Sequence, residues 1–237
     1  GPTLGAEAIQ AGFISFILAL IIVLAYMAFY YSAAGLVADL ALLANLFFVM
    51  GVLSSLGATL TLPGIAGIVL TIGMSVDANV LIYERIREEL RAGKGVRLAI
   101  VDGYKNAYSS IIDANITTLL TGIILYIFGT GPIKGFATTL IIGIATSLFA
   151  AIFITRLLFE WRLDTNATPR ISTTLTQNLM TNTNFQFVRK RRLFYLISGV
   201  IILLGLGSLS MRGLNYGVDF TGGRSYIVRF DETFNVS

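Results

Sequence analysis

Residues 64–90 read GIAGIVLTIGMSVDANVLIYERIREEL, an apolar run that passes without a break into a charged one. The apolar part holds one carboxylate, Asp77, which lies eight residues before Arg85. On a helix that rises about 1.5 Å per residue, this spacing is roughly 12 Å. In a hydrocarbon core about 30 Å thick, Asp77 would therefore lie close to the midplane. An ionisable side chain at that depth is costly and indicates a functional site.

The composition agrees with a membrane protein. Of 237 residues, 55% are hydrophobic and 13% are charged, whereas soluble domains are about 25% charged. The chain has no cysteine, which excludes a disulfide framework and thiol chemistry. It has no histidine either, so the commonest metal ligand is missing and proton chemistry must use carboxylates. We expect no metal site and no cofactor.

Six apolar segments are long enough to span a bilayer. Their expected limits are Gly12–Tyr31, Leu36–Leu56, Pro63–Tyr83, Tyr108–Phe128, Phe136–Phe159 and Leu193–Met211. After Met211, a glycine-rich turn is followed by alternating, strand-like residues. The predicted fold class is an all-α polytopic membrane protein with six transmembrane helices in a packed bundle, followed by the start of a small α+β periplasmic domain.

Lys and Arg predict the orientation. Six lie between Arg85 and Lys105 and seven between Arg156 and Arg192, against four elsewhere. This bias places the two basic loops in the cytoplasm and both ends of the chain on the periplasmic side. The cluster of residues 189–192 directly precedes an apolar segment, so it indicates topology rather than nucleic-acid binding. The chain does not begin with Met and shows no signal-peptide pattern, so we expect a piece of a longer polypeptide.

Two connecting segments differ in character. Residues 85–106 predict an amphipathic helix lying on the membrane surface, with a solvated hinge as the alternative. Residues 163–187 are rich in Thr, Asn, Ser and Gln and show no periodicity, which is typical of a flexible linker.

The tripeptide Asp77-Ala78-Asn79 recurs as Asp113-Ala114-Asn115 in the next span, where Asp113 lies eight residues after Lys105. The two carboxylates therefore have similar depth on antiparallel neighbours. If they face each other, repulsion and desolvation favour a protonated state and permit a proton relay. Asn79, Asn115 and Thr117 would supply hydrogen bonds or a hydrated path.

Two alternatives limit that interpretation. Protonated Asp77 and Asp113 would also serve as structural hydrogen-bond donors between helices. Asp39 lies close enough to the end of the second span to reach water, and we assign it no role.

Several motifs resemble one family. The segment GMSVDANVLIYERIREELRAGK resembles the fourth transmembrane helix of SecD, a component of bacterial protein export, and DANITTLLTGIILYIFGTGPIKGFATTL resembles its next two helices. The opening GPTLGAEAIQAG is similar to the point where the periplasmic domain of SecD meets its second helix. FQFVRKRRLFYLISG and GLNYGVDFTGG resemble the beginning of SecF. The chain as a whole is similar to a fused SecDF.

The resemblance implies four parts. They are a SecD-like membrane domain of five helices (1–162), a cytoplasmic linker at the fusion junction (163–184), a first SecF-like helix (185–211) and the start of a SecF-like periplasmic domain (212–237).

The resemblance also implies a function. SecDF proteins belong to the resistance-nodulation-division superfamily and use the proton gradient to help draw preproteins across the bacterial inner membrane. Implied partners are the SecYEG channel, the SecA motor, the preprotein and membrane lipid, with YajC and YidC as further candidates. Asp77 matches the proton-carrying position and Asp113 the acidic position of the next helix. Such a protein is a translocation subunit, not an enzyme. The alternatives are a proton-driven exporter of small molecules or lipids from the same superfamily, and a passive translocon scaffold.

Overall fold

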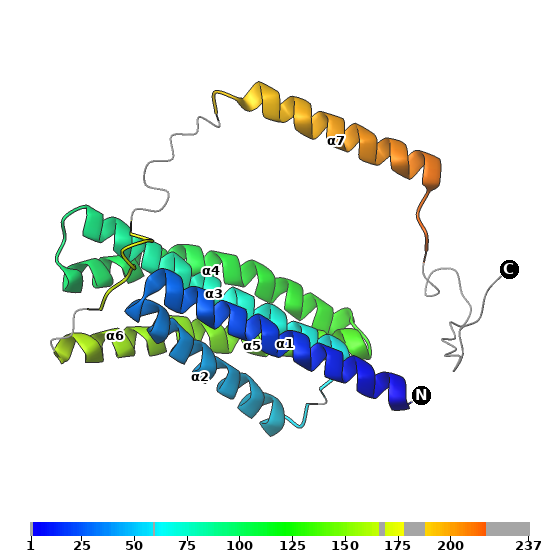
Figure 1. The fold of residues 1–237 in the computed structure, drawn as a ribbon. Coiled ribbons are helices and arrows are strands. Elements are labelled where there is room, and N and C mark those ends of the chain that lie inside the picture. Colours follow the sequence, from blue (N-terminus) through cyan, green and yellow to red (C-terminus); the bar gives the residue numbers. More distant parts are fainter. Residues whose placement is uncertain (1, 59, 166–168, 178–187, 217–237) are drawn as a thin grey trace, which may run out of the picture. The chain divides into compact units, whose positions relative to one another are not determined.

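Six helices that are long and apolar enough to cross a membrane form the framework of the described chain (Figure 1). The computed structural model describes residues 2–58, 60–165, 169–177 and 188–216. It divides into two compact units, residues 1–181 and 182–237, which are considered separately. The number and order of the predicted spans are confirmed. The predicted start of an α+β domain falls mostly on residues 217–237, outside the described residues.

The first unit is a helical bundle. Its elements are α1 (Pro2–Tyr31), α2 (Ala33–Ser55), α3 (Leu62–Arg91), α4 (Val96–Phe128), α5 (Pro132–Phe149), a π-helical turn η1 (Ala150–Ile154) and α6 (Thr155–Asp164). The last three follow one another directly and form one long apolar segment. The described helix of the second unit is α7 (Arg191–Arg212).

Helix α3 is the centre of the bundle and packs against α1, α2, α4 and α5. It begins at Thr61, whose Oγ1 accepts a hydrogen bond of 3.1 Å from the Gly64 amide, and Pro63 occupies the first turn. Small residues permit close approach: a Cβ on Gly143 would overlap Thr71, and a Cβ on Gly103 would overlap Ile86. Such close contacts are how helices associate in lipid, where the hydrophobic effect does not drive them together.

The loop between α3 and α4 is much shorter than expected. Only residues 92–95 separate the two helices, and Gly93 adopts a φ of 88°. Lys94 forms ion pairs of 2.6 Å with Asp102 and Glu89, and hydrogen bonds to these two carboxylates raise the pKa of its ammonium. The predicted surface-lying helix over residues 85–106 is therefore wrong.

The reason is that the loosely spaced apolar residues of this segment face the neighbouring helix instead of a membrane surface. Ala99 and Ile100 are buried in the same core cluster as Ile86. The loop between α1 and α2 is also shorter than expected. Ser32, with a φ of 56°, is the one residue between the two helices, whereas the predicted spans leave residues 32–35 as a turn.

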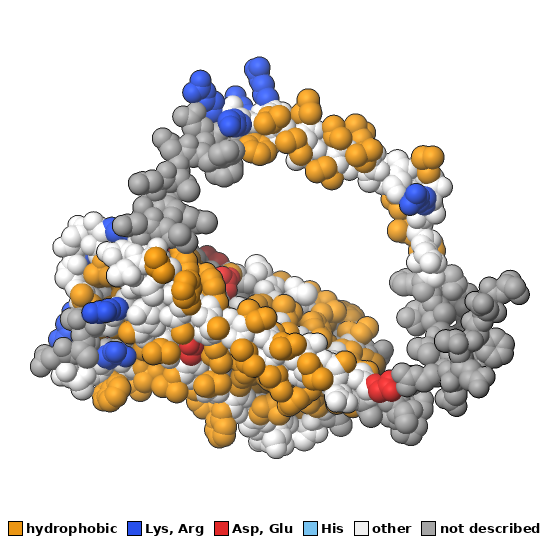
Figure 2. Space-filling model, in the orientation of Figure 1, with side chains coloured by type: hydrophobic (Ala, Val, Ile, Leu, Met, Phe, Trp, Pro, Cys, Tyr) orange, Lys and Arg blue, Asp and Glu red, His pale blue; other side chains and the backbone are white. Residues whose placement is uncertain are grey.

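The surface of the first unit follows the membrane pattern. Figure 2 shows hydrophobic side chains over most of the visible bundle, with Lys and Arg gathered at the end where α6 and the α3–α4 loop lie. We call this the basic end of the bundle.

Candidate functional site

Asp77 lies on an outward face of α3 and is exposed on the first unit. It lines a groove of about 140 Å³ between α3 and α4, which we call the Asp77 groove. Ser110, Asn115 and Thr118 of α4 contribute polar atoms to the same lining. The remaining wall is formed by Met74, Ala78, Leu81, Ile111 and Ala114. A mid-helix carboxylate thus opens onto a mixed polar and apolar surface.

The polar side chains that α4 contributes to the groove partly form hydrogen bonds within their own helix. Asn115 Nδ2 donates to the Ile111 carbonyl oxygen at 2.8 Å, and Thr118 Oγ1 donates to the Ala114 carbonyl oxygen at 3.2 Å. Thr117, predicted as a supporting group, donates to the same carbonyl at 2.9 Å and does not line the groove. The oxygen lone pairs of Asn115 and Thr118 remain available to a protonated carboxyl or to water.

Asp113 is exposed on α4 but is not part of the groove lining. Ser109 Oγ lies 3.5 Å from its Oδ2, which is long for a hydrogen bond. Among the described hydrogen bonds and ion pairs, none joins Asp77 to Asp113. The structure places the two carboxylates on adjacent helices without bringing them into polar contact.

Asn79 faces the interior, although it lies only two residues from Asp77. Its side chain is 1% exposed, and its Nδ2 donates to the Ser75 carbonyl oxygen at 3.3 Å. It belongs to a buried polar stripe with four-residue spacing, which comprises Thr71, Ser75, Asn79, Tyr83 and Arg87. The structure therefore does not place Asn79 in the Asp77 groove.

The buried stripe is a feature that the sequence interpretation missed. Asn79 Oδ1, Ser75 Oγ and the Tyr83 hydroxyl have no hydrogen-bond partner among the described residues, and neither does Asn45 Oδ1 on α2. Asp39 is half-buried, and its Oδ1 is also unpartnered among the described residues. The prediction that Asp39 reaches water is not contradicted by this partial exposure. The signal was present: four polar residues at i, i+4 spacing inside an apolar run predict one face of a helix.

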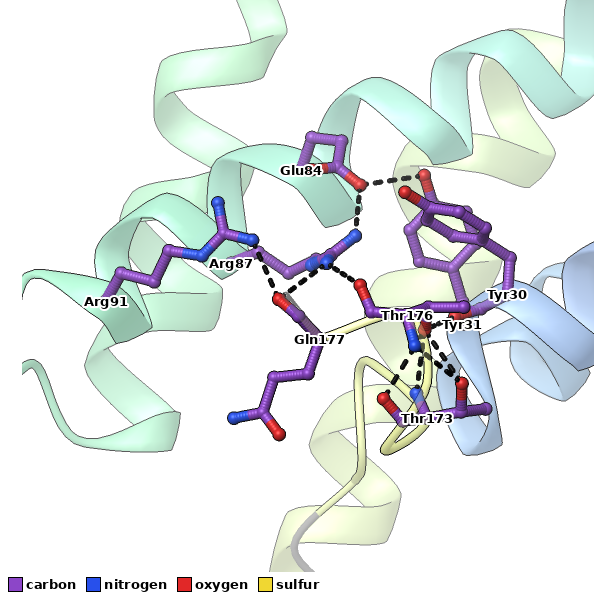
Figure 3. A network of polar contacts seen from close by, with 8 residues as sticks. All are labelled: Tyr30, Tyr31, Glu84, Arg87, Arg91, Thr173, Thr176 and Gln177. Carbon is purple, nitrogen blue, oxygen red and sulfur yellow. Dashed lines mark hydrogen bonds and ion pairs between the residues drawn. The ribbon is translucent and has the colours of Figure 1, made fainter. Parts of the chain in front are cut away.

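The basic end of the bundle holds a network that fixes the end of α3 (Figure 3). Arg87 is 4% exposed; its Nη1 donates to Glu84 Oε1 at 2.7 Å and its Nη2 to the Thr176 carbonyl oxygen at 2.7 Å. Tyr31 donates to the same Glu84 oxygen at 3.0 Å. The guanidinium also lies over the Tyr30 ring, 5.4 Å from its centroid.

Residues 169–177, which we call the return segment, complete this network. Thr176 Oγ1 donates to the Tyr30 carbonyl oxygen at 2.7 Å, and the Ala34 amide donates to the Arg170 carbonyl oxygen at 3.1 Å. Ile171 and Thr176 are 4% and 3% exposed. The flexible-linker prediction is therefore wrong for this part of 163–187, because its polar composition serves hydrogen bonds to helix ends; residues 166–168 and 178–187 lie outside the described residues.

Within the described residues, no group of three or more carboxylates, histidines or cysteines is placed to hold a metal ion.

The fold and the site define an α-helical, multi-span membrane protein with a carboxylate at mid-helix on its central span. Residues 1–165 match the family described as protein export membrane protein SecD/SecF, C-terminal, and residues 207–233 match the SecD/SecF GG motif. Because the first match covers most of the chain, the chain belongs to the SecD/SecF family. The resemblance noted in the sequence is confirmed.

Relatives and solved structures agree. The chain is 60% identical over 161 residues to a protein translocase subunit SecD of Rhodothermus marinus, covering 68% of this chain and 26% of that protein. A SecD of Desulfurispirillum indicum is 60% identical over 160 residues, covering 68% and 31%. The crystal structure of SecDF from Thermus thermophilus, described as a translocon-associated membrane protein, superposes with a TM-score of 0.84 at 42% identity, covering 94% of this chain and 30% of that one. The chain thus spans about a quarter to a third of the relatives it matches.

Proposed function

We propose that this chain serves Sec-dependent protein export, and that Asp77 carries protons across the membrane to drive it. Relatives named protein translocase subunit SecD support the export role. The proton role rests on one observation: the Asp77 carboxylate opens onto a groove whose opposite wall carries Ser110, Asn115 and Thr118.

The physical argument concerns the cost of charge. An ionised carboxylate near the middle of a bilayer is unfavourable by several kcal/mol unless water or a counter-charge reaches it. Binding a proton removes the charge, and the hydroxyl and amide oxygens of the groove can then accept the carboxyl hydrogen. A group that is neutral when dry and ionised when hydrated can take a proton on one side and release it on the other.

Asp113 and Asn115 extend this proposal along α4. Asn115 shares the Asp77 groove, whereas Asp113 lies beside it. We assign Asn115 to holding the Asp77 carboxyl or a water next to it, and Asp113 to the entry or exit of the proton. Thr117 donates to a carbonyl oxygen of its own helix, and Asn79 lies in the bundle interior, so both would support the proton relay indirectly.

The orientation and the partners belong to the same proposal. Thirteen Lys and Arg residues in the two basic loops, against four elsewhere, support a cytoplasmic position for the basic end. SecYEG, SecA and the preprotein are the proposed partners in the bacterial inner membrane, with YajC and YidC as further ones.

The test is Asp77→Asn in the intact protein, assayed in inverted membrane vesicles that contain the Sec machinery. The amide keeps the shape of the side chain but cannot ionise, so we expect normal assembly and loss of gradient-dependent export. Asp164→Asn, which removes an exposed carboxylate paired with Arg97, is the matched control and should export normally. Normal export by Asp77→Asn would refute the proton role.

An infrared difference titration separates the alternatives. A carboxyl band that changes between about pH 6 and 8 and disappears in Asp77→Asn supports a relay. A band that stays protonated throughout makes Asp77 a structural hydrogen-bond donor and favours the scaffold alternative. Proton uptake coupled to a small molecule or lipid, with unchanged protein export, would instead identify an exporter.

A further inference from the structure

A second groove lies between α4 and the η1–α6 segment; it shares Ile111 with the Asp77 groove but none of that groove's polar residues. Its volume is about 430 Å³, and its lining includes Lys105, Tyr108 and Ile111 from α4 together with Ile152, Phe153 and Arg156 from η1 and α6. We call it the α4–α6 groove. Nothing in the proposed proton path uses it.

The polarity of this groove changes along the helix axis. On α4 the lining begins with Val101 and Tyr104 nearest the basic end, continues through Lys105 and Tyr108, and ends at Ile111 deeper in the bundle. The η1–α6 segment runs in the opposite direction, so Arg156 lies toward the basic end while Phe153 and Ile152 lie deeper. The groove therefore carries both of its cations in the half toward the basic end and is lined by Ile111, Ile152 and Phe153 deeper in the bundle, which matches the polarity of a phospholipid.

The two cations retain free donors. Within the described part of the chain, Lys105 takes part in no hydrogen bond or ion pair. Arg156 uses its Nε to donate to Glu160 at 2.9 Å, and both side chains of this pair are 55% exposed. A surface pair of this kind is weak and leaves the rest of the guanidinium accessible. The terminal guanidinium nitrogens can then bind a phosphate in the bidentate geometry that suits arginine.

The wall beside the cations is rigid. Tyr104, which also lines the groove, shares a 2.6 Å hydrogen bond with Thr155, and both side chains are buried. This bond joins α4 to α6 next to Lys105 and Arg156. Packing thus fixes the two helices from which the cations project, as a binding site requires.

We infer that the α4–α6 groove binds an anionic phospholipid, with its phosphate on Lys105 and Arg156 and an acyl chain along Ile111, Ile152 and Phe153. Charge complementarity selects the headgroup, since basic pockets between membrane helices bind anionic lipid heads. The exposed apolar wall supplies the contact for the acyl chain, and Phe153 alone is 63% exposed.

The experiment places a reporter in the groove. Trp161 is the single tryptophan of the chain, so Phe153→Trp combined with Trp161→Phe moves the fluorophore into the lining. The full chain is reconstituted in vesicles of phosphatidylcholine and phosphatidylglycerol, of which one or the other is brominated. Quenching then gives the relative affinity of the groove for the two lipids. We expect phosphatidylglycerol to be preferred, and the preference to fall about fivefold for each cation removed by Lys105→Gln and Arg156→Gln.

The control variant loses the same net charge at positions of the basic end that lie outside the groove. Arg85→Gln with Arg97→Gln removes two exposed cations outside the groove and should leave the preference intact. Equal quenching by the two lipids, or an unchanged preference in the Lys105→Gln/Arg156→Gln chain, would overturn the inference. Absence of quenching by either lipid would show that protein covers the groove, and relief of quenching by inorganic phosphate would show a soluble-anion site instead.

Discussion

The guanidinium of Arg87 donates a 2.7 Å hydrogen bond to the carbonyl oxygen of Thr176, 89 residues further along the chain. Arg87 lies ten residues after Asp77 on the same uninterrupted helix, about 15 Å along its axis. The return segment is therefore attached to the helix that carries the proposed proton carrier. A displacement of residues 169–177 would be transmitted to α3 at its basic end.

Arg87→Gln should destabilise the protein by about 3 kcal/mol. The change leaves the Thr176 carbonyl oxygen and the Glu84 carboxylate without the Arg87 donor, and the Gln177 carbonyl oxygen then has only Arg91. Loss of one partner of a buried ionic contact is costly. Thermal unfolding followed by circular dichroism measures the loss, and hydrogen exchange should show faster exchange in residues 169–177. Arg85→Gln removes an exposed pair with Glu88 and should cost less than about 1 kcal/mol. Equal losses in the two variants would contradict the assigned role of Arg87.

Thr176→Val tests the other side of the same attachment. Valine keeps the shape of threonine but cannot donate to the Tyr30 carbonyl oxygen or bond Thr173, so we expect a loss of about 1 to 2 kcal/mol. Thr174→Val, at an exposed position in the same segment, should be nearly neutral. Combined with Arg87→Gln, the Thr176→Val loss should be less than additive, because both variants release the same segment. Strict additivity in the double variant would show that the two contacts act separately.

The sequence predicted the spans well because their cause is local. A run of about twenty apolar residues must be helical in lipid, where every backbone group needs an internal partner. The loops were predicted poorly because their conformation depends on tertiary contacts. Ala99 and Ile100 look like residues of a surface helix until Ile86 is brought opposite them. The return segment looks like a linker until Arg87 donates a hydrogen bond to its Thr176 carbonyl oxygen.

In the candidate site, too, the properties that depend on local sequence were predictable, and those that depend on tertiary contacts were not. Spacing from Arg85 and Lys105 predicts the depths of Asp77 and Asp113 in the membrane, because position along a helix is a local quantity. It did not show which way each side chain points relative to its neighbours. Asp77 and Asn79 are two residues apart and lie on different faces, one exposed and one buried, so only Asn115 of the two predicted asparagines lines the Asp77 groove.

Two glycine-to-alanine changes should differ in their effect on stability. A Cβ on Gly143 of α5 would overlap Thr71 of α3, so Gly143→Ala should destabilise the bundle by about 1 to 3 kcal/mol. A Cβ on Gly73 meets nothing within 4 Å, so Gly73→Ala should be neutral or stabilise α3 by up to about 1 kcal/mol. Both are measured by thermal unfolding in the same detergent. Destabilisation by both would show that backbone flexibility, and not close packing, explains these glycines.

Asp113→Asn provides the final test of how the two carboxylates divide the work. Asp77 lines the groove and Asp113 does not, so removal of the Asp113 charge should reduce gradient-dependent export by less than about tenfold, while Asp77→Asn should reduce it by about a hundredfold or more. Stability should not change in either variant, because the contact of Ser109 with Asp113 is 3.5 Å long and Asp77 makes no described hydrogen bond. The measurement is export by inverted vesicles at several external pH values. A loss in Asp113→Asn equal to that in Asp77→Asn would mean that the proton has no route to or from Asp77 other than Asp113.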